Sequence, residues 1–581
     1  MSLVEHIRNV AIIAHVDHGK TTLVDQLLYQ SGMFRNADLD KLAGGQHNLI
    51  MDSDPLERER GITILSKNCA VNYTTPQGEE FKINVIDTPG HADFGGEVER
   101  VLKMADGVML VVDAFEGPMP QTRFVLGKAL EHGLRPIVVI NKADRPDSRP
   151  DDVVNEVFDL LVQLEADDEA MDFPVIFASA KNGWAKRDMK DDDDNMLCVF
   201  EAIIEHVPAP EADENTPLQM LVTTLDYSDY VGRIAIGRVF AGSVSDAEIV
   251  TVIDREGKHT QQKITQLYGF EGLGRKTVQS VTAGDICAIA GLDPVDIGNT
   301  IACKDEPKGL PVIDVDEPTM SMTFRVNDGP FAGKDGKFVT SRQIKERLDK
   351  ELQQNVALRV EPGVSGEEFK VSGRGLMHLG ILLENMRREG YEVCVGKPSV
   401  IIREVDGLRQ EPMEHLVIDC PRDCQNSVMS LLGDRRSEML SMDAKSGASD
   451  FVHMEFSIPS RGLFGLHARM LTATQGRAIM HHTFDRYEPM KGAIPQRQAG
   501  VMIATETGQV TAYALDALFD RGFFFVKPGD KVYEGQVVGE HCKDKDCPVN
   551  AAKIFKLVFN DFRSSVLYCQ DKKAKVATSQ W

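Results

Sequence analysis

The sequence has little that would place the chain in or across a membrane. None of the apolar runs in its 581 residues approaches the roughly 18 residues of a membrane-spanning helix. The first residues, Met1 to His6, do not combine a basic segment with an apolar one, so we expect no signal peptide. These absences predict a cytoplasmic chain that does not associate with membranes.

Cysteine is sparse and scattered along the chain. Among the ten cysteines, the close pairs are Cys420 with Cys424 and Cys542 with Cys547. Neither pair has the spacing of a zinc ribbon or of a redox motif. We therefore expect free thiols in a reducing compartment.

Basic residues are few relative to acidic ones, and the formal net charge is −24. Phosphate contacts need lysine and arginine, so this charge by itself argues against nucleic-acid binding. Net charge averages over the whole surface, however, and a large acidic protein can still present one basic face. Five arginines could form such a face, or they could be dispersed, solvated charges, and the sequence leaves both interpretations open. They are Arg435, Arg436, Arg461, Arg469 and Arg477.

The first two hundred residues alternate short apolar runs with helical stretches. The runs are rich in valine and isoleucine, as expected for strands that are buried on both faces. Such strands, separated by helices, indicate a mostly parallel sheet. We expect them at residues 10–14, 83–86, 108–112, 136–140 and 174–178.

A proline-containing linker at residues 207–210 separates this α/β region from smaller domains. Short β-rich runs with glycine turns fill residues 218–303 and indicate a small β-barrel. Residues 319–395 follow a β-α-β-β-α-β order, which is typical of a ferredoxin-like domain, and residues 411–487 repeat it less clearly. From about residue 495 the chain is β-rich again. The sequence therefore predicts several domains, as its length also suggests.

A phosphate-binding loop follows the first expected strand and opens a helix. Residues 14–21 read Ala-His-Val-Asp-His-Gly-Lys-Thr, which fits the loop pattern except that Ala14 replaces the first glycine. Backbone N–H groups of such a loop hold phosphate oxygens. We expect Lys20 to face the β- and γ-phosphates and the Thr21 hydroxyl to bind Mg²⁺. The nucleotide-binding candidates in this loop are Asp17, His18, Gly19, Lys20, Thr21 and Thr22.

Three side chains of this loop allow other interpretations. We interpret His15 and His18 as loop side chains that face solvent, and not as metal ligands. Asp17 could bind a monovalent cation or cap the loop through its carboxylate, and the sequence leaves both roles open.

A second motif, Asp-Thr-Pro-Gly-His at residues 87–91, lies at the carboxyl end of the next expected strand. Asp87 is placed to hold Mg²⁺. The Gly90 backbone N–H can approach a γ-phosphate because glycine has no Cβ. Loss of that phosphate would release the loop, so the motif predicts a nucleotide-dependent switch.

Two further loops are suited to recognising guanine. Residues 141–144, Asn-Lys-Ala-Asp, follow another expected strand. The Asp144 carboxylate can accept hydrogen bonds from both the ring N–H and the exocyclic amine of guanine, a donor pair that adenine lacks. All of these loops follow strands at the edge where open α/β sheets bind ligands. The base-reading candidates are Asn141, Lys142, Asp144, Ser179, Ala180 and Lys181.

With these motifs in place, the sequence resembles translational GTPases. Residues 60–63, Arg-Gly-Ile-Thr, match the first switch of that class, which implies that Thr63 is a further Mg²⁺ ligand. The class also carries a histidine after Asp-Thr-Pro-Gly, here His91. The resemblance implies that His91 is the catalytic residue and positions the attacking water, beside an apolar gate formed by Val16 and Ile62. Phosphoryl transfer needs mainly positioning and charge neutralisation, which an imidazole at this place can assist.

The resemblance extends to the BipA/TypA family over most of the chain. Residues 372–390 are similar to the third domain of the elongation factor G group. Elongation factor G would carry a long further domain for which this chain has no room, LepA lacks the pattern at residues 496–500, and elongation factor Tu lacks the ferredoxin-like pair. The segments that look like BipA/TypA include residues 461–463, 471–474, 496–500, 520–522 and 532–536.

The match is expected to fail from Val566 to Trp581, in place of the family's further C-terminal stretch. The resemblance implies that the C-terminal domain of the family contacts ribosomal RNA and the transfer RNA end. Lys572, Lys573 and Lys575 could contact RNA phosphates or belong to a disordered tail, and both interpretations stay open.

The sequence therefore predicts a multidomain α/β protein with five domains. These are a P-loop GTPase domain (1–209), a β-barrel domain (210–306), two ferredoxin-like α+β domains (307–400 and 401–488) and a β-rich C-terminal domain (489–581) with an atypical tail from 566.

The resemblance implies a monomeric enzyme that hydrolyses GTP to GDP and phosphate with Mg²⁺. It implies the ribosome as partner, through ribosomal RNA and ribosomal proteins, with transfer RNA as a further candidate. The implied role is large-subunit assembly and translation under stress or cold. Two alternatives stay open: a LepA-like or elongation-factor-like GTPase that acts on transfer RNA position, and a nucleotide-switched ribosome-binding module with little turnover.

Overall fold

A computed structural model describes most of the chain, which divides into two compact units, Met1–Ile494 and Pro495–Trp581. Among the described residues, no helix is long and apolar enough to cross a membrane. The described residues are 3–32, 55–60, 63, 66–89, 95–192, 194–312, 318–355, 357–363, 365–444, 451–494 and 499–553.

The first unit begins with a seven-stranded sheet of order β2-β3-β1-β4-β5-β6-β7. The neighbours from β3 to β6 pair in parallel, whereas β2 and β7 run antiparallel at the two edges. The mostly parallel sheet that the apolar runs predict is therefore confirmed. Its strands are β1 (Ile7–Ala14), β2 (Lys67–Thr74), β3 (Glu80–Asp87), β4 (Gly107–Asp113), β5 (Arg135–Asn141), β6 (Val175–Ser179) and β7 (Trp184–Lys186).

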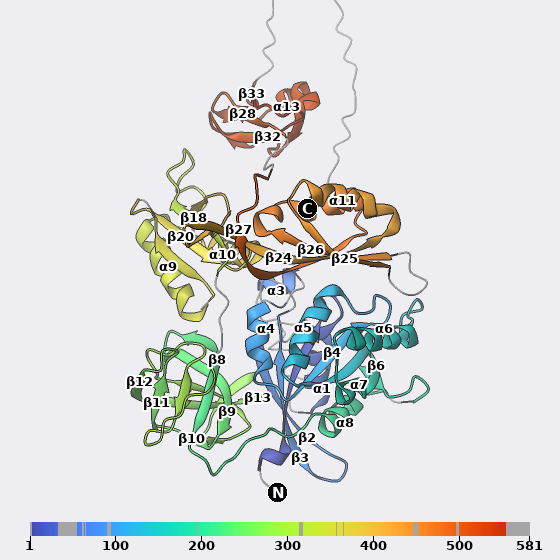
Figure 1. Cartoon of the computed structure of the whole chain (residues 1–581). Coiled ribbons are helices and arrows are strands. Elements are labelled where there is room, and N and C mark those ends of the chain that lie inside the picture. The colour runs from blue at the N-terminus through green and yellow to red at the C-terminus, as the bar shows by residue number, and fades with distance from the viewer. Residues whose placement is uncertain are drawn as a thin grey trace, which may run out of the picture. The chain divides into compact units, whose positions relative to one another are not determined.

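Helices cover both faces of this sheet and create two apolar cores (Figure 1). Neighbouring strand residues point to opposite faces, so Val10 and Ile12 join one core while Ala11 and Ile13 join the other. The first core packs against α1 and α8, and the second against α4, α5 and α6. The helices are α1 (Lys20–Gln30), α3 (Pro55–Arg60), α4 (Gly95–Leu102), α5 (Pro120–Glu131), α6 (Pro150–Gln163), α7 (Asp168–Met171) and α8 (Leu197–His206).

An antiparallel sheet of order β12-β11-β17-β8-β9-β16-β13-β14 follows and encloses its own core. β10 and β15 form a separate small pair. This agrees with the expected β-barrel domain. The strands are β8 (Gln219–Ser228), β9 (Gly232–Ala241), β10 (Ser243–Ser245), β11 (Ile249–Ile253), β12 (His259–Lys263), β13 (Gln266–Glu271), β14 (Gly274–Thr277), β15 (Ser280–Thr282), β16 (Ile286–Ala290) and β17 (Thr300–Ala302).

A buried polar network joins the barrel to the nucleotide domain. Asn9 donates to Asp106 Oδ2 at 2.8 Å and accepts from Asn84 Nδ2 at 2.8 Å. From the barrel side, Asp285 accepts from Asn84 at 3.0 Å and Arg238 lies 2.7 Å from Asp106. Buried polar groups that satisfy one another in this way fix one relative placement, because a shift would leave them unpaired.

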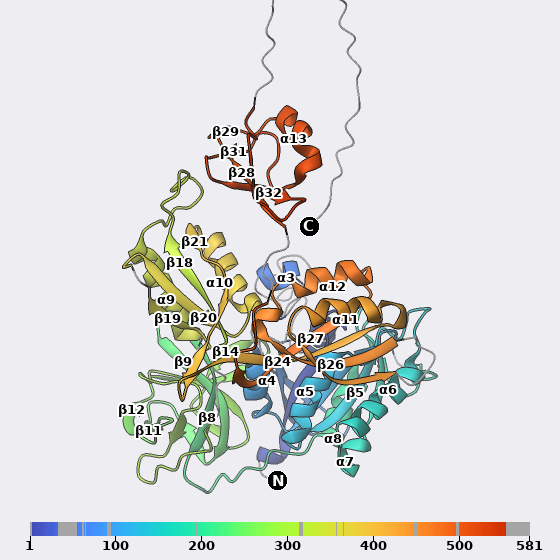
Figure 2. The same cartoon turned by 45° about the horizontal axis from the view of Figure 1, so that its top comes forward.

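Two domains of the β-α-β-β-α-β order come next (Figure 2). The first has the sheet β19-β20-β18-β21, with β22 also paired to β18, and the second has β23-β24-β26-β25, with β27 paired to β24. In each, two helices cover one face of the sheet. The ferredoxin-like pair is therefore confirmed, including the second copy with its weaker signal.

The first of these domains contains β18 (Met320–Val326), α9 (Ser341–Gln354), β19 (Arg359–Pro362), β20 (Glu368–Gly373), α10 (Leu376–Glu389), β21 (Val393–Val395) and β22 (Ser399–Val400). The second contains β23 (Arg403–Val405), β24 (Leu408–Pro421), α11 (Gln425–Gly433), β25 (Glu438–Ala444), β26 (Phe451–Pro459), α12 (Leu466–Thr474) and β27 (Ile479–Pro489). Short 3₁₀ turns lie at Leu3–His6, Arg422–Cys424, Ser460–Gly462 and Phe519–Arg521.

The face of the second sheet opposite its helices carries a histidine that is held by carboxylates. His453 Nδ1 lies 2.7 Å from Asp419 Oδ1, and its Nε2 lies 3.3 Å from Glu455 Oε1. The pKa of His453 is raised, first of all by the hydrogen bond to Asp419 and against the opposing effect of burial.

This raised pKa leads to a pH-dependent stability. The charged pair stabilises the fold fully below the ordinary histidine pKa of about 6.5, and the contribution is lost as pH rises through the higher folded value. We expect His453→Gln to lower the free energy of local unfolding of β24 and β26, measured by native-state hydrogen exchange, more at pH 6 than at pH 9. His206→Gln, at an exposed position, is the control. An equal loss at both pH values would contradict the assignment.

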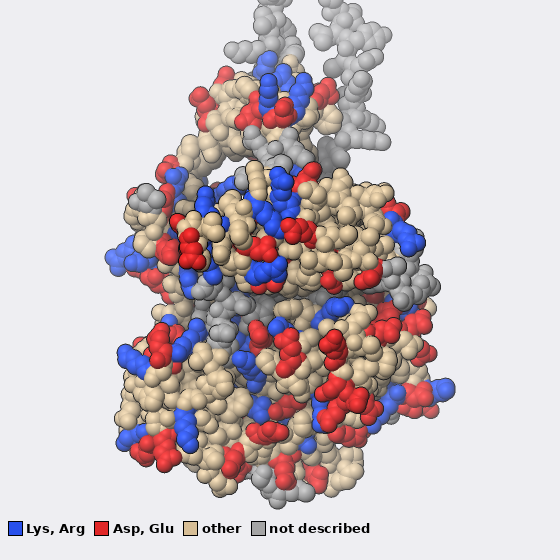
Figure 3. All heavy atoms as spheres, in the orientation of Figure 1, with Lys and Arg blue, Asp and Glu red and all other residues tan. Residues whose placement is uncertain are grey.

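Two of the five arginines considered for a basic face contact groups inside the second ferredoxin-like domain. Arg435 donates to the carbonyl oxygens of Gly462 and Phe464, and Arg461 pairs with the buried Glu411. Arg477 pairs with Asp423 on the surface. On the face drawn in Figure 3, basic and acidic side chains are interspersed. These three arginines are thus engaged within their own domain.

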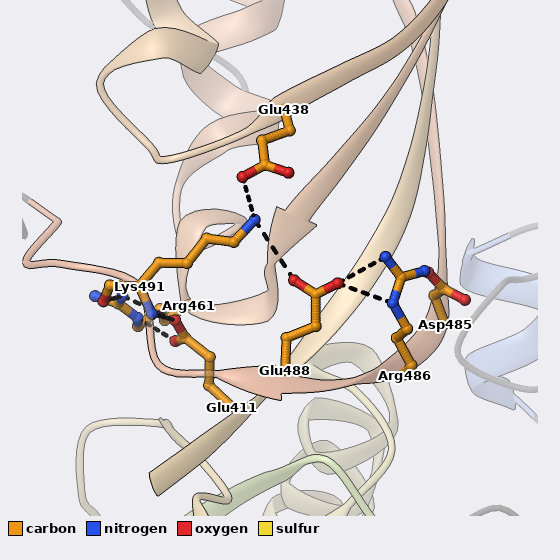
Figure 4. Close-up of polar contacts among 7 residues, drawn as sticks. All are labelled: Glu411, Glu438, Arg461, Asp485, Arg486, Glu488 and Lys491. Atoms are coloured by element: carbon orange, nitrogen blue, oxygen red, sulfur yellow. Dashed lines mark hydrogen bonds and ion pairs between the residues drawn. The ribbon is translucent and has the colours of Figure 1, made fainter. Parts of the chain in front are cut away.

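The ion pairs at the end of β27 form a network (Figure 4). Arg461 pairs with Glu411 and also donates to the backbone carbonyls of Lys491 and Gly492. The Lys491 ammonium lies 2.8 Å from Glu438 and 3.6 Å from Glu488. The chain that leaves β27 is therefore fastened to the second ferredoxin-like domain.

In its described residues, the second unit has a small sheet of order β30-β32-β28-β33, the pair β29-β31 and the helix α13 around an apolar core. Residues 523–526, an apolar run by sequence, begin in the edge strand β30, and Phe523 and Phe525 are more than half exposed. The elements are β28 (Val501–Ala504), β29 (Gly508–Gln509), α13 (Ala512–Leu518), β30 (Gly522–Phe524), β31 (Lys531–Val532), β32 (Val537–His541) and β33 (Cys547–Val549). The five domain boundaries given above stay predictions.

Candidate nucleotide site

The phosphate loop connects β1 to α1 and has the backbone form that such a loop needs. Gly19 precedes α1 with φ of 89°, and a Cβ there would lie 2.4 Å from Asn141 Nδ2. Only glycine fits this place, because the backbone is left-handed and the base-reading loop passes directly above it. Lys20, Thr21 and Thr22 then form the first turn of α1, whose backbone N–H groups have no intrahelical acceptor.

Lys20 and Asp87 meet at the centre of the site. Lys20 Nζ lies 2.7 Å from Asp87 Oδ1 and also donates to the Thr88 carbonyl oxygen. Both side chains are buried. Burial raises the pKa of Asp87, and Lys20 only partly offsets this effect. The carboxylate is thus a desolvated acceptor beside the phosphate loop.

The residues present fit Mg²⁺. Asp87 Oδ2 is buried with no hydrogen-bond partner in the described part of the chain, which suits a hard cation or its water. Thr21 lies in the first turn of α1 and Thr63 is buried. Gly90 and His91, the remaining candidates for the phosphate side, lie outside the described residues.

The base-reading loops follow β5 and β6 and join the phosphate loop through one asparagine. Asn141 Nδ2 donates to the His18 carbonyl oxygen at 2.9 Å, and Asn141 Oδ1 accepts from the Ala180 N–H at 3.0 Å. Asn141 is buried, whereas Asp144 is exposed and accepts from Asn182 Nδ2 at 3.1 Å. The three loops therefore converge at the carboxyl edge of the sheet, as expected.

The remaining base candidates lie on the same edge. Lys142 has φ of 61°, and its ammonium lies 2.6 Å from Asp113 Oδ2. Ser179 and Ala180 are buried, while Lys181 is exposed. Asp17 also has a positive φ, of 65°.

One expectation about the loop is wrong. His18 does not face solvent, because its side chain is fully buried. Its Nδ1 accepts the Asp113 N–H at 3.3 Å, and its ring lies edge-on to His15. A polar ring is tolerated there because β4 ends beside it and supplies hydrogen-bonding partners.

Asp113 is a site residue that sequence reasoning missed. It is fully buried at the end of β4, and its carboxylate lies 2.6 Å from Lys142 Nζ. Burial alone would raise its pKa, but hydrogen bonds from Lys142 and from the Phe115 N–H lower it overall. Its position directly after an apolar strand was a usable signal, since Asp87 and Asn141 stand in the same position.

The short helix α3 links the nucleotide site to the first ferredoxin-like domain. Leu56 is buried and packs against Val16 of the phosphate loop and Ile381 of α10. Glu59 of α3 forms an ion pair with Arg388 of α10. Packed side chains of α3 therefore connect the phosphate loop to that domain.

Comparison with known proteins agrees with this architecture. The chain matches the family profiles "Elongation factor Tu GTP binding domain" at residues 5–209, "Elongation factor Tu domain 2" at 232–302, "Elongation factor G C-terminus" at 409–498 and "TypA/BipA C-terminal domain" at 499–578. The last match runs past Val566, where the resemblance was expected to end.

Similar proteins include "Large ribosomal subunit assembly factor BipA" of three bacteria. The chain is 54% identical to that of Synechocystis over 95% of this chain and 90% of the relative. It is 51% identical to that of Bacillus subtilis, over 95% and 89%, and 51% identical to that of Escherichia coli K12, over 94% and 88%.

The nucleotide domain, the barrel and the ferredoxin-like pair define a translational GTPase. Given the matching C-terminal domain and relatives of more than 50% identity over nearly the whole chain, it belongs to the BipA/TypA family.

Proposed function

We propose that the chain hydrolyses GTP to GDP and phosphate at the converging loops of the first domain. The observation that carries this proposal is the Asn141 side chain, which bonds the phosphate loop at His18 and the second base loop at Ala180. Phosphate and base contacts can therefore be made together by one nucleotide. Asp144 is exposed beside this point, where its carboxylate can meet the guanine edge.

On the phosphate side, the backbone of residues 17–20 and the start of α1, with Thr22, receive the phosphate oxygens. Lys20 faces the β- and γ-phosphates. Thr21, Thr63 and Asp87 would hold Mg²⁺, which supplies neutralisation of phosphate charge when bound. Gly90 approaches the γ-phosphate, and His91 orients the attacking water. On the base side, Lys142 lies against the ring, and Asn141, Ser179, Ala180 and Lys181 complete the pocket.

We propose the large ribosomal subunit as partner. The curated relatives are named as large ribosomal subunit assembly factors, and this chain has the same domains. GTP favours the ribosome-binding state through α3 and α10, and hydrolysis releases it. Sedimentation with ribosomes in GDP and in a non-hydrolysable GTP analogue tests this step. Equal pelleting in both nucleotides would contradict it.

Turnover with and without ribosomes tests the enzyme assignment. We expect ribosomes to stimulate GTP hydrolysis, and His91→Ala to lower the stimulated rate by roughly 10²–10³-fold, the range for removal of one positioned hydrogen-bonding group at a transition state. Nucleotide affinity should change little, because His91 is assigned to water and not to phosphate. Absence of stimulation, with His91→Ala unaffected, would favour a binding module with little turnover.

A further inference from the structure

The buried His18 ring joins two loops that a nucleotide must contact together. Its Nδ1 accepts the Asp113 backbone N–H at 3.3 Å, so this nitrogen carries no proton. The ring proton is then on Nε2, which lies 3.3 Å from Glu116 Oε2. The pKa of Glu116 is lowered, first of all by the His18 side chain. The His18 ring therefore accepts one hydrogen bond through Nδ1, and its Nε2 faces the Glu116 carboxylate at ion-pair distance without a hydrogen bond of good geometry.

The segment that follows β4 also contacts Lys142, one of the base-reading residues. Asp113 Oδ1 accepts the N–H groups of Phe115 at 2.8 Å and Glu116 at 3.4 Å, which fixes the turn that carries Glu116. The second oxygen of Asp113 lies 2.6 Å from Lys142 Nζ. The contacts therefore run from the His18 ring, through Asp113 and its turn, to Lys142.

The main chain of His18 makes a separate connection to the same loops. Its carbonyl oxygen accepts from Asn141 Nδ2 at 2.9 Å. One residue of the phosphate loop is therefore tied to the base-reading loops twice, by its carbonyl and by its imidazole. The carbonyl contact involves an assigned base-reading residue, whereas the imidazole contact involves Glu116, which has no other assigned role.

We propose that His18 and Glu116 are positioning residues that hold the phosphate loop in register with the guanine-reading loops. This proposal rests on the proposed function, because it concerns how tightly the same site retains a guanine nucleotide. Without the contact, the two halves of the site move independently, and each must be brought into place when GDP or GTP binds. The side chain acts through Asp113 and Lys142 and does not touch the nucleotide.

Glu116 is the better position for the test because its side chain is 43% exposed, so its truncation opens no buried cavity. We expect Glu116→Ala to raise the dissociation rate of fluorescent N-methylanthraniloyl-GDP roughly fivefold, the effect of losing one polar contact. Glu116→Gln keeps an acceptor oxygen and should restore a rate near that of wild type. Glu131→Ala, which removes an exposed carboxylate of α5, is the matched control.

A second measurement separates positioning from local folding. Tripolyphosphate carries phosphates without a base, so it engages only the phosphate loop. We expect Glu116→Ala to weaken GDP binding and leave tripolyphosphate competition unchanged. Equal weakening of both ligands would overturn the proposal, because it would mean that the phosphate loop itself had collapsed. The double variant His18→Ala/Glu116→Ala should be no weaker than His18→Ala alone.

The failures of the two proposals are distinguishable. If the wild-type chain does not bind N-methylanthraniloyl-GDP, the proposed function fails. If the wild type binds it and Glu116→Ala releases it at the wild-type rate, the positioning role fails while the proposed function stands.

Discussion

The Asp144→Asn chain is expected to bind xanthosine diphosphate in preference to GDP. The carboxylate of Asp144 accepts from the ring N–H and the exocyclic amine of guanine. An asparagine amide places a donor where the amine would be, which suits the carbonyl of xanthine and leaves the guanine amine without an acceptor. Sites that hydrogen-bond a ligand reject a mismatched analogue by up to roughly 10⁴–10⁵-fold, so we expect GDP affinity to fall by at least about 100-fold.

The fold should tolerate this change. Asp144 is exposed, and its side chain accepts a hydrogen bond from Asn182 Nδ2 at 3.1 Å. Asp147→Asn, at an exposed position of the same loop, is the control for a general loss of charge. Titration calorimetry with GDP and xanthosine diphosphate measures both affinities. An Asp144→Asn chain that still prefers GDP would refute the role of this residue in base choice.

The nucleotide loops could be predicted from sequence because each stands directly after an apolar strand. The strands that end at Asp87, Asn141 and Ser179 run parallel in one sheet, so their loops had to meet at the same edge. The same reasoning reached both ferredoxin-like domains, since alternation of strands and helices is a local property of the chain.

The contact between His18 and Asp113 was beyond that reasoning for a different physical cause. They are 95 residues apart, and nothing near His18 in sequence marks its ring as buried. Isolated histidines in loops mostly face water, and only the position of the end of β4 encloses this one. Likewise Leu56 and Ile381 belong to separate domains, so their contact depends on how those domains pack.

The interface between the barrel and the nucleotide domain also depends on contacts that local sequence patterns do not predict. Its pairs, such as Asn84 with Asp285, join residues 201 apart and depend on a placement that no local pattern encodes. Individually these residues look like ordinary polar strand residues. Together they fasten the barrel to the nucleotide domain through buried polar contacts.

Removal of the Arg461 guanidinium should have the largest effect on stability. Glu411 is fully buried, and Arg461 pairs with both of its oxygens. Breaking a buried ion pair by deleting one partner costs about 3–5 kcal/mol, because the remaining charge stays desolvated. In this variant the Glu411 carboxylate would keep the hydrogen bond from the backbone N–H of Lys491, whose nitrogen lies 2.7 Å from Glu411 Oε1 (Figure 4). Arg461→Ala should therefore destabilise the second ferredoxin-like domain strongly.

The same network contains its own control. Arg486 pairs with Asp485 and with Glu488, but its side chain is 56% exposed, so its charge remains hydrated. Arg486→Ala should cause no measurable loss, since exposed ion pairs contribute little. Native-state hydrogen exchange of the amides of β24, β26 and β27 reports the stability of this domain alone, which a global melting curve of a multidomain chain does not.

The companion variant Arg461→Met/Glu411→Leu tests the physical cause. It removes both charges, and much of the lost protection should return, because the penalty in Arg461→Ala comes from the unpaired carboxylate. Recovery would remain incomplete, since Arg461 also holds the carbonyls of Lys491 and Gly492. If Arg461→Ala exchanged no faster than Arg486→Ala, the buried pair would not be what fastens the end of β27 to its domain.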